Sequence, residues 1–586
     1  MQISKVTLRG FRNFKDATIN LSRKSLIIGC NEIGKSNMLH ALRMLLDRQL
    51  SQADLEPQDS DFYAHEDTND IEILVQLSGV CEDCILAKLR EHVSDEGTTY
   101  LAYQATRDPI SRRKKYRILV GRDIDALAEI ETRFYLRVLN LEFMGSRRNL
   151  LSFIRRERKY LLQDARENRE EGEVERDNET LGKIQSKLRE VNEDVASLVY
   201  VSNATNSLNE ELYDLSIQNS TQEVVFDTGA ADPSLFVDDL NLASRVGEKT
   251  LAIGGDGRTN QIHLALWTAR KKVVLDPEEE PLSVTIFCIE EPEAHLHPHQ
   301  QRKLANYLSD TLDAQVIITT HSPQITCEFS PNSIIRLYDN RPDTLAAGDG
   351  TNPFVEEAFI EFGHRLSIIP AEAFFSSLVL LVEGPSEELF YKALAASIGV
   401  DLDRLNISIL MVDGIGFKPY VSLLSSLRIG YVIRTDNDIF KIPKKDAYRF
   451  AGVQRGIEIY RTFCERNEEF ERLLQLHEGK LDGIASRRPP EENLVAVHQI
   501  IHRLEDFNIF IADVDLEHDL HNALGSTTAD FFDLTADEEI IRQMQKRKAT
   551  FMFDFLRSYS DTLTDLRDHS LAKPLLRCQK IVETGL

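Results

Sequence analysis

The sequence GCNEIGKS at residues 29–36 decides the fold of the first half of the chain. It follows a short apolar run at residues 25–28 and precedes NMLHALRMLLD at residues 37–47, in which apolar residues recur at helical spacing. A strand, a glycine-rich loop and a helix in this order form the setting that a phosphate-binding loop requires. The stretch therefore predicts a nucleotide site within an α/β domain.

Most positions of this loop suit a bound nucleotide. Gly29 and Gly34 let the backbone curl so that its N–H groups face the phosphates, and Asn31 lies between them. We expect Lys35 to neutralise the β- and γ-phosphate oxygens and Ser36 to ligate Mg²⁺. These five residues are the predicted nucleotide contacts of the loop.

Two later apolar runs end in residues suited to the same site. Residues 284–289 lead into Glu290 and Glu291, and residues 316–320 lead into His321. A buried strand that delivers carboxylates at its carboxyl end suits a metal–phosphate site. We expect Glu290 to contact the metal, where an aspartate is more usual, and Glu291 to activate the attacking water. His321 is a candidate sensor of the γ-phosphate, and a solvated acidic turn is the alternative for the first run.

A glycine-rich turn, GGDGR at residues 254–258, lies between the loop and the acidic strand. Such a turn before a helix is common by itself. In this order, however, the motifs resemble the ABC-type ATPases of the SMC and RecF kind, whose signature loop faces the nucleotide of a second subunit. The resemblance implies that ATP, with Mg²⁺, is sandwiched between two heads and that Gly255 lies at the nucleotide.

Residues 139–225 separate the two halves of the ATPase pattern and are rich in Arg, Glu, Asp and Asn. Six apolar residues from Leu181 to Leu198 alternate steps of three and four, which is the spacing of a heptad seam. The seam is too short for a long coiled coil, so we expect a short helical arm. The arm either packs on its own domain or forms a dimer contact.

Three strand-like apolar runs in the last third of the chain alternate with expected helices, and each ends in acidic residues. The runs are residues 378–382, 407–412 and 431–435, and the acids after the first and third are Glu383, Glu387, Asp436 and Asp438. Because the carboxyl ends of parallel strands meet at one edge of a sheet, we expect these four acids to lie together.

Clustered carboxylates are destabilised unless a divalent cation balances their charge. Two Mg²⁺ or Mn²⁺ ions about 4 Å apart would activate water and stabilise the leaving oxygen of a phosphodiester. The order E-G-x-x-E, D-G and D-x-D resembles the Toprim fold of topoisomerases, primases and OLD-family nucleases, which implies a two-metal site at the four acids. The second acid of that fold is usually aspartate, so Glu387 is a departure that we expect to alter the metal distance without removing a ligand.

Two segments further along carry additional candidates. DVDLEHDL at residues 513–520 follows another strand-like run at residues 508–512, and its Asp515 and Glu517 either ligate a metal or cap the next helix. Lys573 aligns loosely with the lysine that OLD-type nucleases use to stabilise transition-state charge, and a surface lysine is the alternative.

The charge of the chain limits how it can meet DNA. With 69 basic and 95 acidic residues the net charge is −26, so any DNA contact must be local or bridged by metal. The 586 residues correspond to about four units of roughly 150 residues, or to two large domains. No long apolar run and no disulfide pattern is present in the sequence, so we expect a cytoplasmic protein without membrane contact.

The motifs together resemble the OLD family, in which an ABC-type ATPase is fused to a Toprim nuclease. In order they are FRNF, GCNEIGKS, GGDGR, IEEPEAHLHP, THSP, EGPSE, TDND and DLEHDL. Within that family the chain is most similar to the nuclease subunits of Gabija anti-phage systems. The resemblance implies an ATPase head over residues 1–138 and 226–368, a helical insertion for dimerisation over 139–225, and a Toprim nuclease domain over 369–586.

The resemblance also implies a function. It implies an ATP-regulated, metal-dependent endonuclease that acts on double-stranded DNA. It also implies a dimer or tetramer and a UvrD-like helicase subunit, GajB, as partner. Alternatives are a retron-associated or stand-alone OLD nuclease, a non-cutting DNA-binding ATPase like SMC or RecF, and topoisomerase-like strand passage. Strand passage would need a nucleophilic tyrosine near the metals, and no tyrosine in the sequence has a suitable context.

Overall fold

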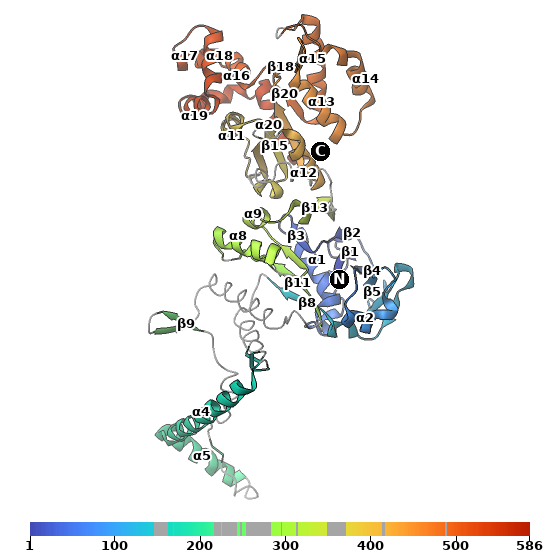
Figure 1. Ribbon diagram of the computed structural model, residues 1–586, viewed down its shortest axis with the longest axis vertical. Helices are drawn as coiled ribbons and strands as arrows, with labels where there is room; N and C mark the ends of the chain where they lie inside the picture. Colours follow the sequence, from blue (N-terminus) through green and yellow to red (C-terminus); the bar gives the residue numbers. More distant parts are fainter. Residues whose placement is uncertain are drawn as a thin grey trace. The chain divides into compact units, whose positions relative to one another are not determined.

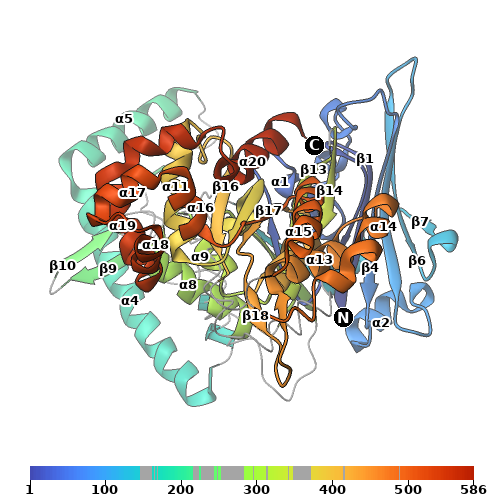
Figure 2. The same cartoon turned by 90° about the horizontal axis from the view of Figure 1, so that it is seen from above.

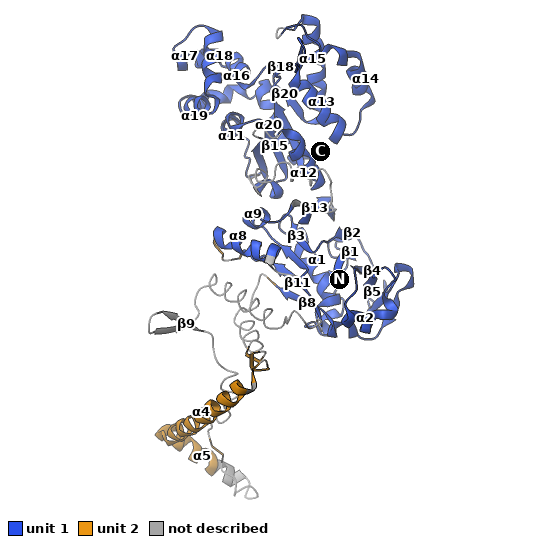
Figure 3. Ribbon diagram, in the orientation of Figure 1, with its two compact units in different colours: residues 1–144, 283–293, 298–586 blue, residues 145–282, 294–297 orange. Residues whose placement is uncertain are grey.

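The computed structural model describes most of the chain as two compact units (Figure 3). The described residues are 1–145, 162–215 except 164 and 168, 224–225, 243–246, 249–252, 283–347 except 295, 312–313 and 341, and 371–585 except 413–415 and 487–488. The first unit comprises residues 1–144, 283–293 and 298–586, and the second comprises 145–282 and 294–297. The glycine-rich turn with Gly255 lies outside the described residues.

An antiparallel sheet opens the first unit, and its long strands β4 and β6 stand together at the right of Figure 2. The strand order is β2-β1-β4-β5-β6-β7. The bounds are β1 Gln2–Phe11, β2 Phe14–Asn20, β4 Asp70–Ser78, β5 Thr99–Arg107, β6 Lys114–Gly121 and β7 Ala128–Ile130. Sequence analysis did not predict this sheet.

A second sheet, ordered β14-β13-β3-β12-β11-β8, carries the nucleotide motifs (Figure 1). Its strands are β3 Lys24–Ile28, β8 Leu139–Met144, β11 Val284–Glu290, β12 Val316–Thr319, β13 Ile334–Asn340 and β14 Asp343–Ala347. All neighbours are parallel except β13 and β14. The strands predicted before the phosphate loop, the acid pair and His321 are therefore confirmed, and parallel order brings their carboxyl ends to one edge.

Helix α1, Lys35–Leu46, follows the loop and contacts β8 of this sheet and β5 of the antiparallel one. Its Met38, Leu42 and Leu45 are fully buried in the core that both sheets share. The loop itself needs glycine, because Gly29 has φ 152° and a Cβ there would lie 2.6 Å from the carbonyl oxygen of Leu337. The other helices of this part are α2 Asp83–Leu89, α8 Pro298–Asn306 and α9 Pro323–Thr326.

The C-terminal part of the first unit is built on a four-stranded sheet with the order β16-β15-β17-β20. The strands are β15 Leu378–Val382, β16 Ile407–Met411, β17 Gly430–Thr435 and β20 Ile509–Ile511. All pairs are parallel, which confirms the four strands predicted from the apolar runs. Helices α11 Pro385–Ile398, α12 Phe417–Ser426 and α20 Lys573–Thr584 contact this sheet.

Two helical groups extend from this sheet and are visible at the top of Figure 1. Between β17 and β20 lie the hairpin β18 Ile439–Lys441 and β19 Tyr448–Phe450, and helices α13 Ala451–Phe463, α14 Glu468–His477 and α15 Glu491–Leu504. After β20 come α16 Leu516–Ala523, α17 Gly525–Phe532, α18 Asp537–Lys546 and α19 Lys548–Tyr559. Both groups supply residues to the site described below.

The second unit contains the helices α4 Glu171–Ser197 and α5 Val199–Leu215 and the hairpin of β9 Ala243–Val246 and β10 Lys249–Ala252. The seam predicted from Leu181 onward lies on α4, so the helical arm is confirmed. Within the seam Val191 is 50% exposed, and a dimer contact there stays a prediction. None of the helices that can be described is both long and apolar enough to cross a membrane.

Candidate functional site

The phosphate loop and the acidic strand meet at the carboxyl edge of the second sheet. Lys35 is buried, and its Nζ donates to the carbonyl oxygens of Gly29 at 2.9 Å and Cys30 at 2.7 Å. Burial lowers the pKa of Lys35 to about 8. The hydroxyl of Ser36 donates to a carboxylate oxygen of Glu290. The loop and the end of β11 therefore bring a lysine, a hydroxyl and a carboxylate together, the groups that a phosphate-binding loop uses.

The other predicted members of this site lie beside them. His321 Nε2 is 3.7 Å from Glu291 Oε1, and burial lowers the pKa of this histidine. Glu291 has φ 46°, a left-handed conformation that is strained for a non-glycine residue and common at functional sites. The backbone N–H of His321 donates to Glu293 Oε1 at 2.7 Å, a contact that the sequence analysis missed. Asn31 is exposed on the loop.

A second group of carboxylates lies at the carboxyl ends of β15 and β17. Glu383 Oε1 accepts hydrogen bonds from the backbone N–H of Asp436, at 2.9 Å, and from the Thr435 hydroxyl. The same oxygen is bound by the guanidinium of Arg455, which reaches it from α13. Segments more than fifty residues apart thus meet at one carboxylate oxygen, as parallel pairing of the two strands requires.

Burial and the repulsion between neighbouring carboxylates raise the pKa values in this group, so its ionised form needs positive charge nearby. Burial raises the pKa of Glu387 to about 7 and that of Asp436 to about 8, and the charges of Glu383 and Glu387 add to the second shift. The pKa of Asp438 is also raised, by burial and then by Glu383. Glu387 is held in place by the backbone N–H of Gly384, which donates to its Oε2 at 3.0 Å. We refer to Glu383, Glu387, Asp436 and Asp438 as the acid cluster.

Lys548 and Arg455 supply the positive charge, and sequence analysis named neither. Lys548 Nζ from α19 is 2.8 Å from Glu517 Oε2 and 3.8 Å from Asp436 Oδ2. Arg455 Nη2 is 4.0 Å from Asp438 Oδ2. Glu517 itself is fully buried, so of the two candidate acids named in DVDLEHDL it is the one that faces the acid cluster through Lys548. No motif surrounds either cation in the sequence.

Asp515 and Lys573 make contacts of a different kind. Asp515 caps the N-terminus of α16, because its Oδ1 accepts a hydrogen bond of 2.8 Å from the backbone N–H of His518. Gln545 donates to the other carboxylate oxygen of Asp515. Lys573 Nζ donates to both oxygens of Glu505, at 2.8 and 3.0 Å. Within the described structure Lys548, and not Lys573, is therefore the lysine in contact with the acid cluster.

The acid cluster fits divalent cations by its chemistry. Over the described ranges no three acidic, histidine or cysteine side chains already stand in a metal-coordinating arrangement. Instead, Arg455 and Lys548 occupy positions where positive charge is needed, and carboxylate oxygens are the donors that Mg²⁺ and Mn²⁺ prefer. A metal would compete with these two cations for the same oxygens.

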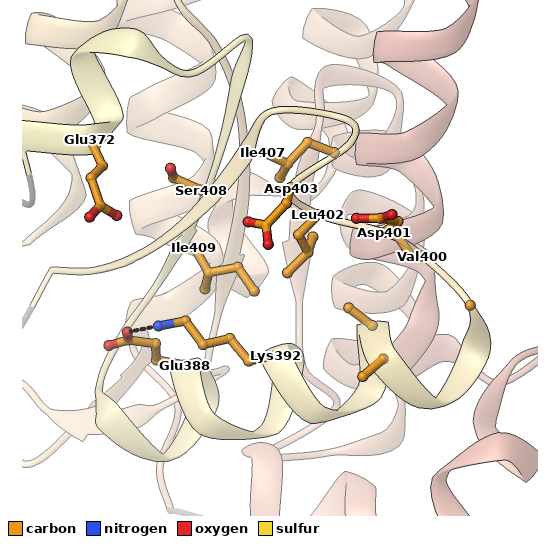
Figure 4. A pocket seen from close by; sticks show the side chains of 13 residues that line it. Glu372, Glu388, Lys392, Val400, Asp401, Leu402, Asp403, Ile407, Ser408 and Ile409 are labelled. Carbon is orange, nitrogen blue, oxygen red and sulfur yellow. Dashed lines mark hydrogen bonds and ion pairs between the residues drawn. The ribbon is translucent and has the colours of Figure 1, made fainter. Parts of the chain in front are cut away.

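A cavity of about 670 Å³ lies beside α11 and contains none of the four acids (Figure 4). Its charged residues are Glu372, Glu388, Lys392, Asp401 and Asp403. Glu388 and Lys392 form an ion pair of 2.5 Å, drawn as the dashed line in Figure 4. The cavity is therefore separate from the acid cluster.

A buried arginine joins the ATPase sheet to the C-terminal sheet. Arg336 lies in β13, where it pairs with Ile28 of β3, the residue that precedes the phosphate loop. Its guanidinium donates to the carbonyl oxygens of Leu427 at 3.2 Å, Arg428 at 2.7 Å and Ser376 at 3.4 Å. Leu427 and Arg428 follow α12, so the charge also meets the negative end of that helix dipole.

Comparison with known proteins agrees with this two-part organisation. The family model described as AAA ATPase domain matches residues 1–228 and 151–326, and the model for the overcoming lysogenization defect protein-like TOPRIM domain matches residues 374–438. The chain belongs to the AAA ATPase domain family and joins that domain to an OLD-like TOPRIM domain. The family resemblance seen in the sequence, and the expected order of its two domains, are confirmed for this OLD-like ATPase–TOPRIM protein.

Individual relatives are distant in sequence but extend over long stretches. Endonuclease GajA from Bacillus cereus (strain VD045) is 26% identical over 580 residues, covering 96% of each chain. OLD nuclease from Thermus scotoductus is 26% identical over 236 residues, 37% of this chain and 42% of that protein. Among solved structures, the Smc head bound to the C-terminal winged-helix domain of ScpA aligns at 15% identity and a TM-score of 0.35, over 59% of this chain and 97% of that one.

Proposed function

We propose that this OLD-like ATPase–TOPRIM protein is a divalent-metal-dependent endonuclease that cuts double-stranded DNA under the control of ATP. The observation that carries the proposal is the convergence of Glu383 and Asp436. These two acids belong to a carboxylate group that is separate from the phosphate loop, and within it burial raises the pKa of Asp436 and of Glu387. An ATPase that only bound DNA would need no second acidic site.

The residues that would hold Mg²⁺ or Mn²⁺ are the acid cluster, joined by Glu517. When bound, two such ions would polarise a phosphodiester and lower the pKa of an attacking water. They would also attract the DNA backbone, which the net charge of −26 repels. In the nucleotide site, Ser36 and Glu290 would hold Mg²⁺, and Glu291 would orient water.

Lys548 has the position expected of a residue that stabilises charge on the cut phosphate. It lies between Asp436 and Glu517, and these carboxylates raise its pKa although burial lowers it. It would therefore stay protonated during the reaction and oppose negative charge that develops on the phosphodiester. Lys573 pairs with Glu505 and would leave cutting largely unchanged.

Control by ATP would pass through Arg336. A nucleotide that reshapes the loop at Gly29 acts directly on β13, because Gly29 packs against Leu337. Arg336 connects that strand to Leu427 and Arg428, which lead into β17, and Asp436 directly follows β17. The route gives ATP a physical means of changing the acid cluster.

The biological setting follows from the relatives. The near full-length match to a protein named Endonuclease GajA supports a place in anti-phage defence of the Gabija type, with a UvrD-like helicase, GajB, as partner. The exposed Val191 and Leu198 of the seam support a dimer or tetramer, in which the turn with Gly255 would complete the nucleotide site of a second subunit.

The test uses supercoiled plasmid with full-length protein and Mn²⁺ or Mg²⁺, with and without ATP. We expect nicked or linear product that EDTA abolishes. Glu383→Gln should remove cutting to background while nucleotide binding persists. Glu388→Gln is the matched control, because Glu388 lies on the same helix as Glu387 but lines the cavity of Figure 4. Cutting by Glu383→Gln at the wild-type rate, or untouched plasmid with wild-type protein, would contradict the proposal.

A further inference from the structure

A buried ion pair lies directly behind the acid cluster. Arg434 is 6% exposed and precedes Asp436 by two residues in β17. Its Nη2 donates to Asp519 Oδ2 at 2.7 Å, its Nε donates to the Tyr391 hydroxyl at 3.1 Å, and its Nη1 donates to the carbonyl oxygen of Thr435 at 3.1 Å. One guanidinium thus contacts three elements of the domain.

Each of these elements also carries a member of the proposed metal site. Tyr391 lies one helical turn after Glu387 in α11, and Asp519 lies two residues after Glu517 in α16. Thr435 immediately precedes Asp436. The contacts of Arg434 therefore fix the two helices against the strand at the level where their carboxylates meet.

The ion pair fixes the positions of the elements that it joins more than it stabilises the fold. Burying two charges costs solvation that their attraction barely recovers, so apolar side chains of similar size often give equal stability. Asp519 is 6% exposed, and its second oxygen has no hydrogen-bond partner among the described residues. An arrangement that leaves such an atom unsatisfied is poorly explained by stability alone.

The three hydrogen bonds that Arg434 donates go to Tyr391, Thr435 and Asp519, none of which belongs to the acid cluster. Arg434 is therefore a candidate positioning residue, not a catalytic one. We propose that the Arg434–Asp519 ion pair, anchored by Tyr391, sets the spacing between Asp436 and the helices that carry Glu387 and Glu517, and thereby sets the affinity for divalent cations. This inference rests on the proposed metal-dependent function.

The experiment measures Mn²⁺ binding to the full-length protein by electron paramagnetic resonance, without DNA or ATP, beside thermal unfolding. Asp519→Asn keeps the shape of the side chain and removes its charge. We expect Mn²⁺ affinity to fall roughly 10- to 100-fold, the range typical when a residue that orients metal ligands is changed. Plasmid cutting by this variant should recover at saturating Mn²⁺. The variant should therefore need a higher Mn²⁺ concentration but reach the wild-type maximal rate.

Two further variants separate positioning from simple destabilisation. Leu575→Ala creates a cavity in the same apolar core at α20, a helix that carries neither residue of the ion pair, and should lower Tm without changing Mn²⁺ affinity. The double variant Arg434→Met with Asp519→Leu removes both charges and should regain Tm relative to Asp519→Asn. Its Mn²⁺ affinity should remain low, because the directional contacts are lost.

The outcomes distinguish this inference from the proposed function. Wild-type Mn²⁺ affinity in Asp519→Asn, or in the double variant, would overturn the positioning role while leaving the metal site intact. Mn²⁺ affinity that simply follows Tm across all variants, Leu575→Ala included, would also overturn it. Wild-type protein that binds no Mn²⁺ would overturn both the metal site and the inference.

Discussion

The ATPase half and the TOPRIM half of the first unit both deliver carboxylates from the ends of parallel strands, yet they balance that charge differently. In the ATPase half the cation is Lys35, which belongs to the phosphate loop itself. In the TOPRIM half the cations are Arg455 and Lys548, which come from helices outside the strand–acid motifs. Asp436 is buried, whereas the Glu291 side chain is 38% exposed.

The difference shows how each site depends on its surroundings. A loop that carries its own lysine can be ready for a nucleotide wherever the strand–loop–helix unit folds. A buried carboxylate group needs charge from elsewhere, either from remote side chains or from divalent cations. The TOPRIM site should therefore respond more strongly than the ATPase site to changes in distant residues, in metal and in pH.

The largest expected effect separates the two C-terminal lysines. Lys548→Met should lower plasmid cutting about 100-fold, because a single preorganised cation at a transition state is typically worth that much. Lys573→Met should leave the rate within about twofold, since removal of an exposed ion pair costs little. Initial rates in saturating Mn²⁺ check both. Equal losses of cutting rate in the two variants would contradict the assignment of the charge-stabilising role to Lys548 instead of Lys573.

The next effect concerns the ATPase half alone. Lys35→Ala should weaken ATP binding roughly 10- to 100-fold, because it removes charge-assisted hydrogen bonds to the phosphates. Cutting without ATP should stay at the wild-type level. Lys15→Ala is the control, since Lys15 is an exposed lysine paired with Glu66. Binding of a fluorescent ATP analogue gives the measurement, and an equal loss of ATP-free cutting would mean that the two sites are not separate.

A smaller effect tests the connection between the halves. Arg336→Met keeps an apolar stem and removes the donors that reach Leu427, Arg428 and Ser376. The ratio of cutting rates with and without ATP should move toward one by a factor of about 5, the lower end of typical allosteric coupling. Arg449→Met, at an exposed position, is the control. A ratio unchanged from wild type, with ATP binding intact, would exclude Arg336 as the connection.

The smallest effect is the pH dependence of stability in metal-free protein. Asp436, with its pKa raised to about 8, and Glu387, with its pKa raised to about 7, keep protons in the folded state that the unfolded chain has already released. Their contribution to stability is therefore present at low pH and is lost as pH rises through 7 to 8. We expect Tm in EDTA to fall by roughly 2 °C between pH 6 and 8.5.

Mn²⁺ should reverse most of that fall, because it replaces the missing protons with positive charge. In the double variant Asp436→Asn with Glu387→Gln, the Tm in EDTA should change little between pH 6 and 8.5. A Tm in EDTA that rose over the same pH interval, in wild type but not in the double variant, would contradict the raised pKa values of Asp436 and Glu387.

Parts of this site could be predicted because local sequence determines them. Apolar runs that end in acids specify buried parallel strands, and parallel pairing then forces Glu383 and Asp436 to the same edge. The glycine positions of the phosphate loop are equally local, since backbone conformation at Gly29 admits no side chain.

Other parts depend on tertiary contacts that no short pattern encodes. Arg455 and Lys548 reach the acid cluster from helices that carry no motif, so sequence reasoning chose Lys573 instead. Whether Asp515 or Glu517 faced the cluster depended on which one capped α16, and the hydrogen bond from His518 answered that. The six-stranded antiparallel sheet was also missed, because its pairing of β1 with β4 joins strands that β2, β3 and α1 separate in the chain, and no distinctive residue pattern marks it.

The central claim is that the carboxylates at the ends of β15 and β17 hold divalent cations. It is tested most directly by titrating Mn²⁺ into nucleotide-free protein at pH 8 and following free Mn²⁺ by electron paramagnetic resonance, for wild type and for Asp436→Asn. We expect two bound ions in wild type and a clear loss of binding in the variant. Superimposable titrations for the two proteins would contradict it.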